Sequence, residues 1–200
     1  MRFPSVVLLG LTLTLTLTLG LGGCTFVSTL KATTVSYRVP ADAGDTALIR
    51  IVSQGSVRGV PYSDCIDWRK PGSGVMVKPH RGIANPKFRS LGIPMSAETD
   101  RMRRQEGFGA NELKLPANRP FALMFYNSEP GQLENFRAVC EQSVSFVPEA
   151  GATYQLVFLQ DQQCTALLRK IDEQGRMQAE PVGLHSSDYC SPDARIRDHW

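Results

Sequence analysis

The stretch that decides the fold is Ser143–Leu159, which reads SVSFVPEAGATYQLVFL. Its two ends, Ser143–Val147 and Thr153–Leu159, are rich in β-branched, aromatic and aliphatic residues, as is typical of β-strands. The residues between them, Pro148-Glu149-Ala150-Gly151-Ala152, include the proline and glycine that favour a turn. The sequence therefore predicts two core strands joined by a short turn, and we expect them to pair as an antiparallel hairpin.

Further strand-like segments lie on both sides of this stretch. Phe121–Tyr126 is continuously apolar, which is typical of a strand buried on both faces. Gly55 separates the apolar segment Ala47–Ser53 from Ser56–Val60, and we expect these two to form a second hairpin. The remaining predicted strands are Thr34–Val39, Gly74–Lys78, Glu112–Leu115 and Thr165–Ile171, the last of which begins at Cys164 and turns back along Thr153–Leu159.

The spacing of these segments predicts an all-β fold. About seven to eight short, mostly antiparallel strands with turns between them indicate a single β-sandwich. We expect at most one short helix. Its signals are Ser96 as the N-cap, Glu98 and Asp100 in the first turn, Arg103 and Arg104 in the last turn, and Gly107 as terminator.

Composition limits the classes of function. The chain has 200 residues, of which 42% are hydrophobic and 20% charged, as expected of a globular protein. The net charge is +3, and Arg2 is the one charged residue before Cys24, so the remainder carries +2. This small charge gives no support for binding to nucleic acid.

The N-terminus has the features of a secretion signal. Arg2 precedes Val6–Leu21, in which every residue is Val, Leu, Gly or Thr, and which is short for a membrane span. It ends in Leu21-Gly22-Gly23-Cys24, which resembles the bacterial lipobox. The resemblance implies cleavage between Gly23 and Cys24, a diacylglycerol on the Cys24 thiol, and a further acyl chain such as palmitate on the new amino group.

This resemblance divides the chain into three parts. Residues 1–23 are the expected lipoprotein signal peptide, residues 24–34 the lipidated N-terminus and tether, and residues 35–200 the sandwich domain. In Gram-negative sorting an aspartate after the lipidated cysteine favours the inner membrane, and here that residue is Thr25. We therefore expect a protein held by its lipid on the periplasmic face of the outer membrane.

Four cysteines remain once Cys24 is set aside, and an even number in an oxidising compartment predicts two disulfides. Zinc or redox sites are less well supported, because no two of the four have C-x-x-C spacing. Three pairings are possible. If the first hairpin forms, Cys140 and Cys164 lie at the same end of the sheet, which favours Cys140–Cys164 and leaves Cys65–Cys190, with the C-terminal tail tied to an early strand.

The least regular part of the domain is residues 79–110, a length that is often functional in a compact fold. It is also basic, and it could contact anionic lipid or peptidoglycan; the alternative is a solvated loop. The residues expected to make such a contact are Arg81, Lys87, Arg89, Arg101, Arg103 and Arg104.

Two stretches carry a resemblance to a family. Ser143–Phe158, and Leu115–Pro120 before an apolar strand, resemble the strand–turn–strand units of small proteobacterial outer-membrane lipoproteins with an immunoglobulin-like or carboxypeptidase-regulatory-like sandwich. The resemblance covers about residues 110–170 and does not extend to the basic insertion or the tail. It implies a fold and a location, and it brings no catalytic residues.

No motif for chemistry stands out. There is no G-x-S-x-G sequence, and His80, His185 and His199 lack metal-ligand spacing, so we expect no catalytic residue, cofactor or metal. Asp64 and Asp67 are better explained as a solvated loop beside Cys65 than as paired catalytic carboxylates. We therefore expect a non-enzymatic binding or structural module of the cell envelope, with a protein, anionic lipid or peptidoglycan as partner. The alternatives are a secretion-system lipoprotein similar to that of type VI secretion and, with less support, an envelope hydrolase.

Overall fold

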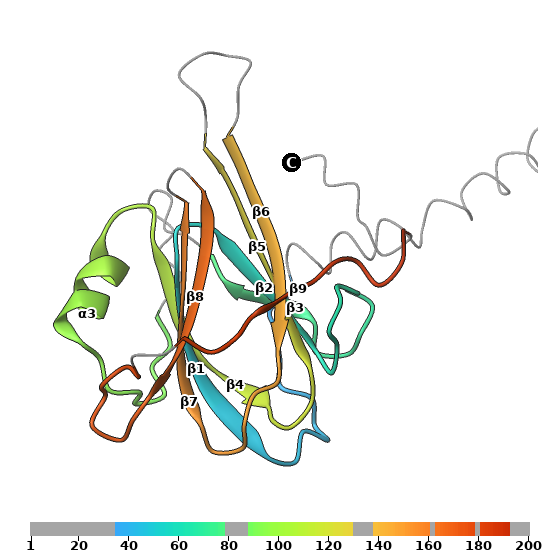
Figure 1. The fold of residues 1–200 in the computed structure, drawn as a ribbon, viewed down its shortest axis with the longest axis horizontal. Helices are drawn as coiled ribbons and strands as arrows, with labels where there is room; N and C mark the ends of the chain where they lie inside the picture. Colours follow the sequence, from blue (N-terminus) through green and yellow to red (C-terminus); the bar gives the residue numbers. More distant parts are fainter. Residues whose placement is uncertain (1–34, 79–87, 130–137, 161–162, 179–180, 193–200) are drawn as a thin grey trace, which may run out of the picture.

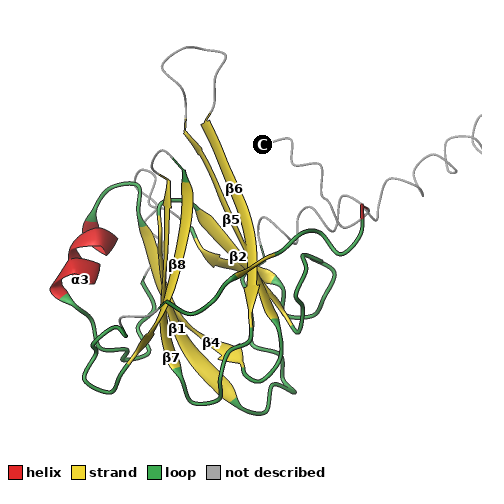
Figure 2. Ribbon diagram, viewed as in Figure 1, coloured by secondary structure: helices red, strands yellow, loops and turns green. Residues whose placement is uncertain are grey.

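The computed structural model describes residues 35–78, 88–129, 138–160, 163–178 and 181–192. The predicted signal peptide, Cys24 and the tether therefore lie outside the described residues. The described chain is an all-β sandwich with a single helix, as expected (Figure 2). Its elements are β1 (Thr46–Ser53), β2 (Ser56–Pro61), β3 (Gly74–Val77), α3 (Ala97–Arg104), β4 (Gly109–Pro116), β5 (Phe121–Glu129), β6 (Ala138–Phe146), β7 (Thr153–Gln160), β8 (Cys164–Ile171) and β9 (His185–Ser186).

The strands form two sheets that face each other (Figure 1). The first, here called the β1 sheet, has the order β4-β1-β7-β8, and the second, the β5 sheet, has the order β3-β2-β5-β6-β9. β1 and β7 are parallel, and the other pairs of strands are antiparallel. α3 lies outside the sandwich, against the β1 sheet.

Aromatic rings from the two sheets meet in the core between them. Phe125 of β5 stacks on Phe158 of β7, with 4.9 Å between the ring centroids. Phe146 of β6 meets Tyr154 of β7 edge to face at 5.5 Å. All four side chains are at most 2% exposed, so these pairs bury large apolar surfaces and hold the two sheets together.

The predicted hairpin of Ser143–Val147 with Thr153–Leu159 is wrong. β6 belongs to the β5 sheet and β7 to the β1 sheet, so the intervening turn carries the chain from one sheet to the other. Main-chain hydrogen bonds attach this turn to the start of β1, from Gly151 to Thr46 and from Leu48 to Ala152. Phe146 and Tyr154 both face the core from their two sheets, and a sequence pattern gives no information on which strand lies alongside.

The predicted hairpin of Ala47–Ser53 with Ser56–Val60 is also wrong, because β1 and β2 lie in different sheets. The favoured two-residue hairpin turns need a positive φ at one or both central residues. Neither Gln54 nor Gly55 has one. A Cβ on Gly55 would lie 2.4 Å from the main-chain oxygen of Tyr126, so glycine here permits a close crossing over β5.

Other expectations are met with small changes. α3 begins after Ser96, whose side chain accepts the Thr99 main-chain N–H, and basic residues occupy its last turn. The hairpin of β7 with β8 forms as predicted. The first expected strand is reduced to one parallel bridge, between Ser36 and Val75, and β9 was not anticipated.

A second apolar cluster covers the outer face of the β5 sheet. Trp68, from the loop after β2, is 2% exposed and packs with Val60, Ala122 and Met124. The C-terminal tail adds Tyr189 to this cluster. β5 is thus buried on both faces, as its continuously apolar sequence predicts.

Two disulfides tie these layers together, and both pairings are the expected ones. Cys65–Cys190 joins the loop that carries Trp68 to the C-terminal tail. Cys140–Cys164 joins β6 of one sheet to β8 of the other. The second therefore links the two sheets, and the prediction that both of its cysteines lie at the end of one sheet is wrong.

The two disulfides should contribute unequally to stability. Cys65 and Cys190 are 125 residues apart in sequence, and Cys140 and Cys164 are 24 apart. Loop-closure entropy predicts a loss of about 5 kcal/mol for Cys65→Ala/Cys190→Ala and about 3.5 kcal/mol for Cys140→Ala/Cys164→Ala. The free energy of unfolding from guanidinium titration should rank the two variants in that order; equal losses would contradict the prediction.

Candidate functional site

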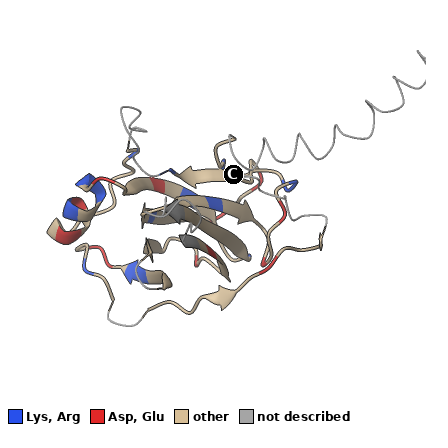
Figure 3. Ribbon diagram, turned by 90° about the horizontal axis from the view of Figure 1, so that it is seen from above, with Lys and Arg blue, Asp and Glu red and all other residues tan. Residues whose placement is uncertain are grey.

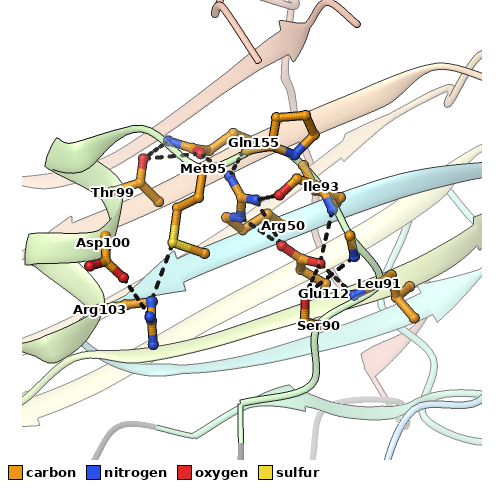
Figure 4. A network of polar contacts seen from close by, with 12 residues as sticks. Arg50, Ser90, Leu91, Ile93, Met95, Thr99, Asp100, Arg103, Glu112 and Gln155 are labelled. Atoms are coloured by element: carbon orange, nitrogen blue, oxygen red, sulfur yellow. Dashed lines mark hydrogen bonds and ion pairs between the residues drawn. The ribbon is translucent and has the colours of Figure 1, made fainter. Parts of the chain in front are cut away.

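A buried ion pair lies on the outer face of the β1 sheet, beneath the segment that leads into α3 (Figure 4). Arg50 of β1 and Glu112 of β4 are direct neighbours in the strand register, and Gln155 of β7 lies on the other side of Arg50. The Arg50 Nη2 atom is 2.8 Å from Glu112 Oε1, and the two side chains are 1% and 0% exposed. Ile49 and Ile51 face the core, so Arg50 points the opposite way.

The ion pair satisfies the main chain of residues 91–94. Arg50 donates hydrogen bonds to the carbonyl oxygens of Ile93 and Pro94. The Glu112 Oε2 atom accepts the N–H groups of Leu91 and Ile93. Because buried polar groups are costly without partners, this exchange holds an otherwise irregular segment against the sheet.

α3 is fixed to the sheet by the same row of side chains. Thr99, which is 0% exposed, exchanges hydrogen bonds with the Gln155 amide at 2.9 and 3.2 Å. Gln155 also accepts a hydrogen bond from Arg50, so the helix, the loop and the sheet share one network. Figure 4 shows Thr99 and Gln155 on the helix side of Arg50.

Two of the three arginines of α3 share one carboxylate of the same helix. Arg103 and Arg104 both pair with Asp100, at 2.5 and 2.9 Å. Hydrogen bonds from Arg104 and then Arg103 hold the pKa of Asp100 below its usual range. Charges of both signs are therefore present on the helix (Figure 3). Arg101 is exposed.

A groove opens between the edge strands of the two sheets, and we call it the β3–β4 groove. It consists of two adjoining hollows of about 420 and 240 Å³ that share Tyr37, Arg89 and Leu113. One side is formed by residues 36–39 and the other by Arg89 and Leu91. Its other lining residues are Val75, Met76, Val77 and Lys78 of the β3 region and Ala110, Asn111 and Lys114 of β4.

The wall at Arg89 is set by the buried network. The Arg89 main chain donates to Asn111 Oδ1 at 3.2 Å and accepts the Glu112 N–H at 3.0 Å. Glu112 thus fixes the strand edge with its main chain and holds residues 91–93 with its carboxylate. The opposite wall is held by Tyr37, whose hydroxyl donates to the Lys114 carbonyl oxygen at 3.0 Å.

Four basic residues line this groove: Arg38, Lys78, Arg89 and Lys114. All four are exposed, and no aspartate or glutamate is among the lining residues. Of these, Arg89 is one of the contact residues predicted from the sequence. Arg38 and Lys114 were missed because they come from segments distant in sequence, and no local pattern connects them.

The other expected contact residues are dispersed. Arg81 and Lys87 lie outside the described residues. Arg101, Arg103 and Arg104 belong to α3, whereas Arg89 lies in the β3–β4 groove. The irregular basic segment is therefore divided into a helix and a groove wall in its described part.

The acidic loop beside Cys65 has a structural explanation. Asp67 pairs with Arg69 at 2.8 Å, and the hydrogen bond from Arg69 lowers the pKa of Asp67. The Asp64 main-chain oxygen accepts a hydrogen bond from the Ser187 hydroxyl of the tail. These carboxylates therefore belong to a loop that the disulfide and the tail hold in place.

Within the described ranges, no three His, Cys, Asp or Glu side chains converge as a metal site would require. No described helix has the length and apolar character needed to span a membrane. No protein-family model matches the chain, and no curated protein is detectably similar to it in sequence.

Glu112→Gln should release residues 88–96 from the sheet. It leaves the buried Arg50 guanidinium without a counter-charge, which typically costs about 3 to 5 kcal/mol. We expect a loss of unfolding free energy of that size and faster trypsin cleavage after Arg89. Glu98→Gln, on the exposed side of α3, is the matched control and should change neither. Equal effects of the two substitutions would show that the ion pair does not hold the segment.

Proposed function

We propose that this chain is a lipid-anchored protein of the bacterial cell envelope that acts by binding rather than by catalysis. The disposition of the five cysteines carries the proposal. Cys65, Cys140, Cys164 and Cys190 are consumed in two disulfides, which are typical of oxidising compartments. Cys24 is then the one cysteine outside a disulfide, and it stands directly after Leu21-Gly22-Gly23, where a lipobox requires it.

The proposed anchor is sufficient to hold the domain at a membrane. Each buried methylene contributes about 0.8 kcal/mol, so one acyl chain binds only marginally. A diacylglycerol on the Cys24 thiol together with an amide-linked acyl chain supplies three chains. Because Thr25 rather than aspartate follows Cys24, we propose the periplasmic face of the outer membrane as the location.

Binding is supported by the contrast between the buried and exposed charges. The buried pair of Arg50 and Glu112 is saturated by bonds to its own chain, which is the arrangement of a structural element. The basic residues of the β3–β4 groove are exposed around a hollow, where a ligand can reach them. A groove with charges of one sign favours a partner of the opposite charge.

Metabolic labelling with an alkyne analogue of palmitate tests the anchor. The wild-type chain should incorporate label and fractionate with membranes, because the Cys24 thiol and amino group carry the acyl chains. Cys24→Ala should remove the label and leave the chain unprocessed. Cys65→Ala/Cys190→Ala is the matched control for loss of cysteine, and it should retain the label.

The anchor proposal fails if Cys24→Ala incorporates label and is processed as the wild type is. Separation of inner and outer membranes on a sucrose gradient tests the address. Thr25→Asp should move the labelled protein towards the inner membrane, whereas Thr25→Ser should leave its distribution unchanged. An inner-membrane location of the wild type would overturn the proposed address.

A further inference from the structure

The β3–β4 groove has the shape of a site for an extended chain. β4 lines it from Ala110 to Lys114, and Val75–Val77 of β3 and the following Lys78 line it as well. At about 3.4 Å per residue, five residues of strand span roughly 14 Å, enough for four or five residues of an extended peptide. The lining of the groove therefore follows β4 over a length that suits an extended peptide.

Main-chain groups of β4 line this groove, because β4 lies at the end of its sheet. The outer edge of β3 is already used, since Val75 exchanges main-chain hydrogen bonds with Val35 and Tyr37. Within the described residues, β4 has a strand partner on one side only, and that partner is β1. On the outer side of β4, the Glu112 N–H donates a hydrogen bond to the Arg89 carbonyl oxygen, and the Lys114 carbonyl oxygen accepts one from the Tyr37 hydroxyl. The edge between these anchored points offers main-chain groups of the kind that an added strand can pair with.

The chemistry of the groove combines an apolar floor with a basic rim. Tyr37 is 6% exposed and belongs to the sandwich core, and Leu113 packs against that core. Arg38, Lys78, Arg89 and Lys114 stand around them with no ion pair to a described carboxylate. Elsewhere, Arg69, Lys170 and Arg176 each pair with an acidic side chain. The rim therefore favours a ligand that brings its own carboxylates.

Two close approaches fix the groove at its ends. A Cβ on Gly74 would lie 2.4 Å from the Val35 carbonyl oxygen, and one on Gly109 would lie 2.1 Å from that of Lys78. Glycine at these two positions lets residues 35–37 reach β3 and lets β3 reach β4. The separation of the walls is thus set by the main chain.

We propose that the β3–β4 groove binds an extended acidic segment of a partner protein, in which glutamate or aspartate alternates with aliphatic residues. The inference rests on the proposed function as an envelope binding module and adds the chemistry of its partner. A lipid bilayer has no extended main chain that could pair with the edge of β4, so it is a less suitable partner for this groove.

The groove also has a defined place relative to the proposed anchor. One of its walls, residues 36–39, follows the tether of eleven residues, 24–34, with only Val35 between them. An extended chain of eleven residues spans at most about 40 Å. The acidic segment should therefore belong to a protein that exposes it within about that distance of the membrane.

The test uses the lipidated full-length mature protein in nanodiscs of phosphatidylcholine. The probe is a fluorescein-labelled peptide of four Glu-Val repeats, and its binding is followed by fluorescence anisotropy. The wild type should bind it, and Arg38→Glu/Lys114→Glu should weaken binding at least tenfold, because two attractive charges become repulsive. A Lys-Val peptide of equal length should not bind.

Arg101→Glu/Arg104→Glu is the matched control, because it changes the net charge equally on exposed positions of α3. It should leave the affinity within twofold of the wild type. Equal weakening by both double variants, or no binding of the acidic peptide by the wild type, would overturn the proposal. Thermal melting of each variant shows whether the fold is retained, and Lys114→Gln alone should still weaken binding about fivefold.

Two further arms address the mode of binding and the other class of partner. N-methylation of alternate peptide bonds in the probe should weaken binding, and an unchanged affinity would overturn pairing with the strand edge. If glycerol 3-phosphate, which carries the headgroup chemistry of phosphatidylglycerol without a charged bilayer, displaces the acidic peptide from the wild type in phosphatidylcholine nanodiscs, a lipid headgroup is the ligand of the groove and the proposal of a protein partner is overturned. Palmitate labelling of Arg38→Glu/Lys114→Glu should stay at the wild-type level, because these substitutions do not touch Cys24. Loss of peptide binding with normal labelling therefore concerns the groove, whereas loss of labelling in the wild type concerns the anchor.

Discussion

The ion pair of Arg50 and Glu112 is the constraint on which the outer half of this structure depends. A buried ion pair contributes little net stability unless its remaining hydrogen-bonding capacity is used. Here that capacity is used by the main chain of residues 91–94, which has no strand or helix to satisfy it. The pair thus converts an irregular insertion into an ordered layer. It also positions Arg89, and with it one wall of the β3–β4 groove.

Each sheet is covered on its outer face by irregular segments, and the two sheets hold these segments by different interactions. On the β1 sheet, hydrogen bonds donated by Arg50 and Gln155 and accepted by Glu112 hold the covering segment and α3. On the β5 sheet, apolar packing of Trp68 and the Cys65–Cys190 disulfide hold the covering loop and the tail. Both devices bring segments far apart in sequence onto a common surface. As a result, a domain of modest size has a buried inner core and two further protected faces.

The hydrophobic pattern predicted most strands, because alternation reports directly on which side chains face a core. The correct disulfide pairing followed from a hairpin that does not form. Cys140 and Cys164 would lie at one end of a sheet if β6 paired with β7, and they also lie close together when β6 faces β8 across the sandwich. Thr165–Ile171 and Thr153–Leu159 pair as predicted because they are close neighbours in one sheet. The predicted strand pairs on either side of Gly55 and of Gly151 are wrong because the chain crosses from one sheet to the other at each turn. Such a crossing leaves the same alternation of core-facing and outward-facing side chains as a hairpin does.

The sequence by itself determined the all-β sandwich, the helix capped by Ser96 and the set of cysteines available for pairing, because periodicity, capping and residue type are local properties. Only the tertiary structure decided that β1 is parallel to β7, that Arg50 meets Glu112, and that four basic residues gather at one groove. Arg38, Arg89 and Lys114 belong to segments separated by tens of residues. Their proximity follows from strand order and from a buried ion pair, which are fixed only when distant parts of the chain pack together.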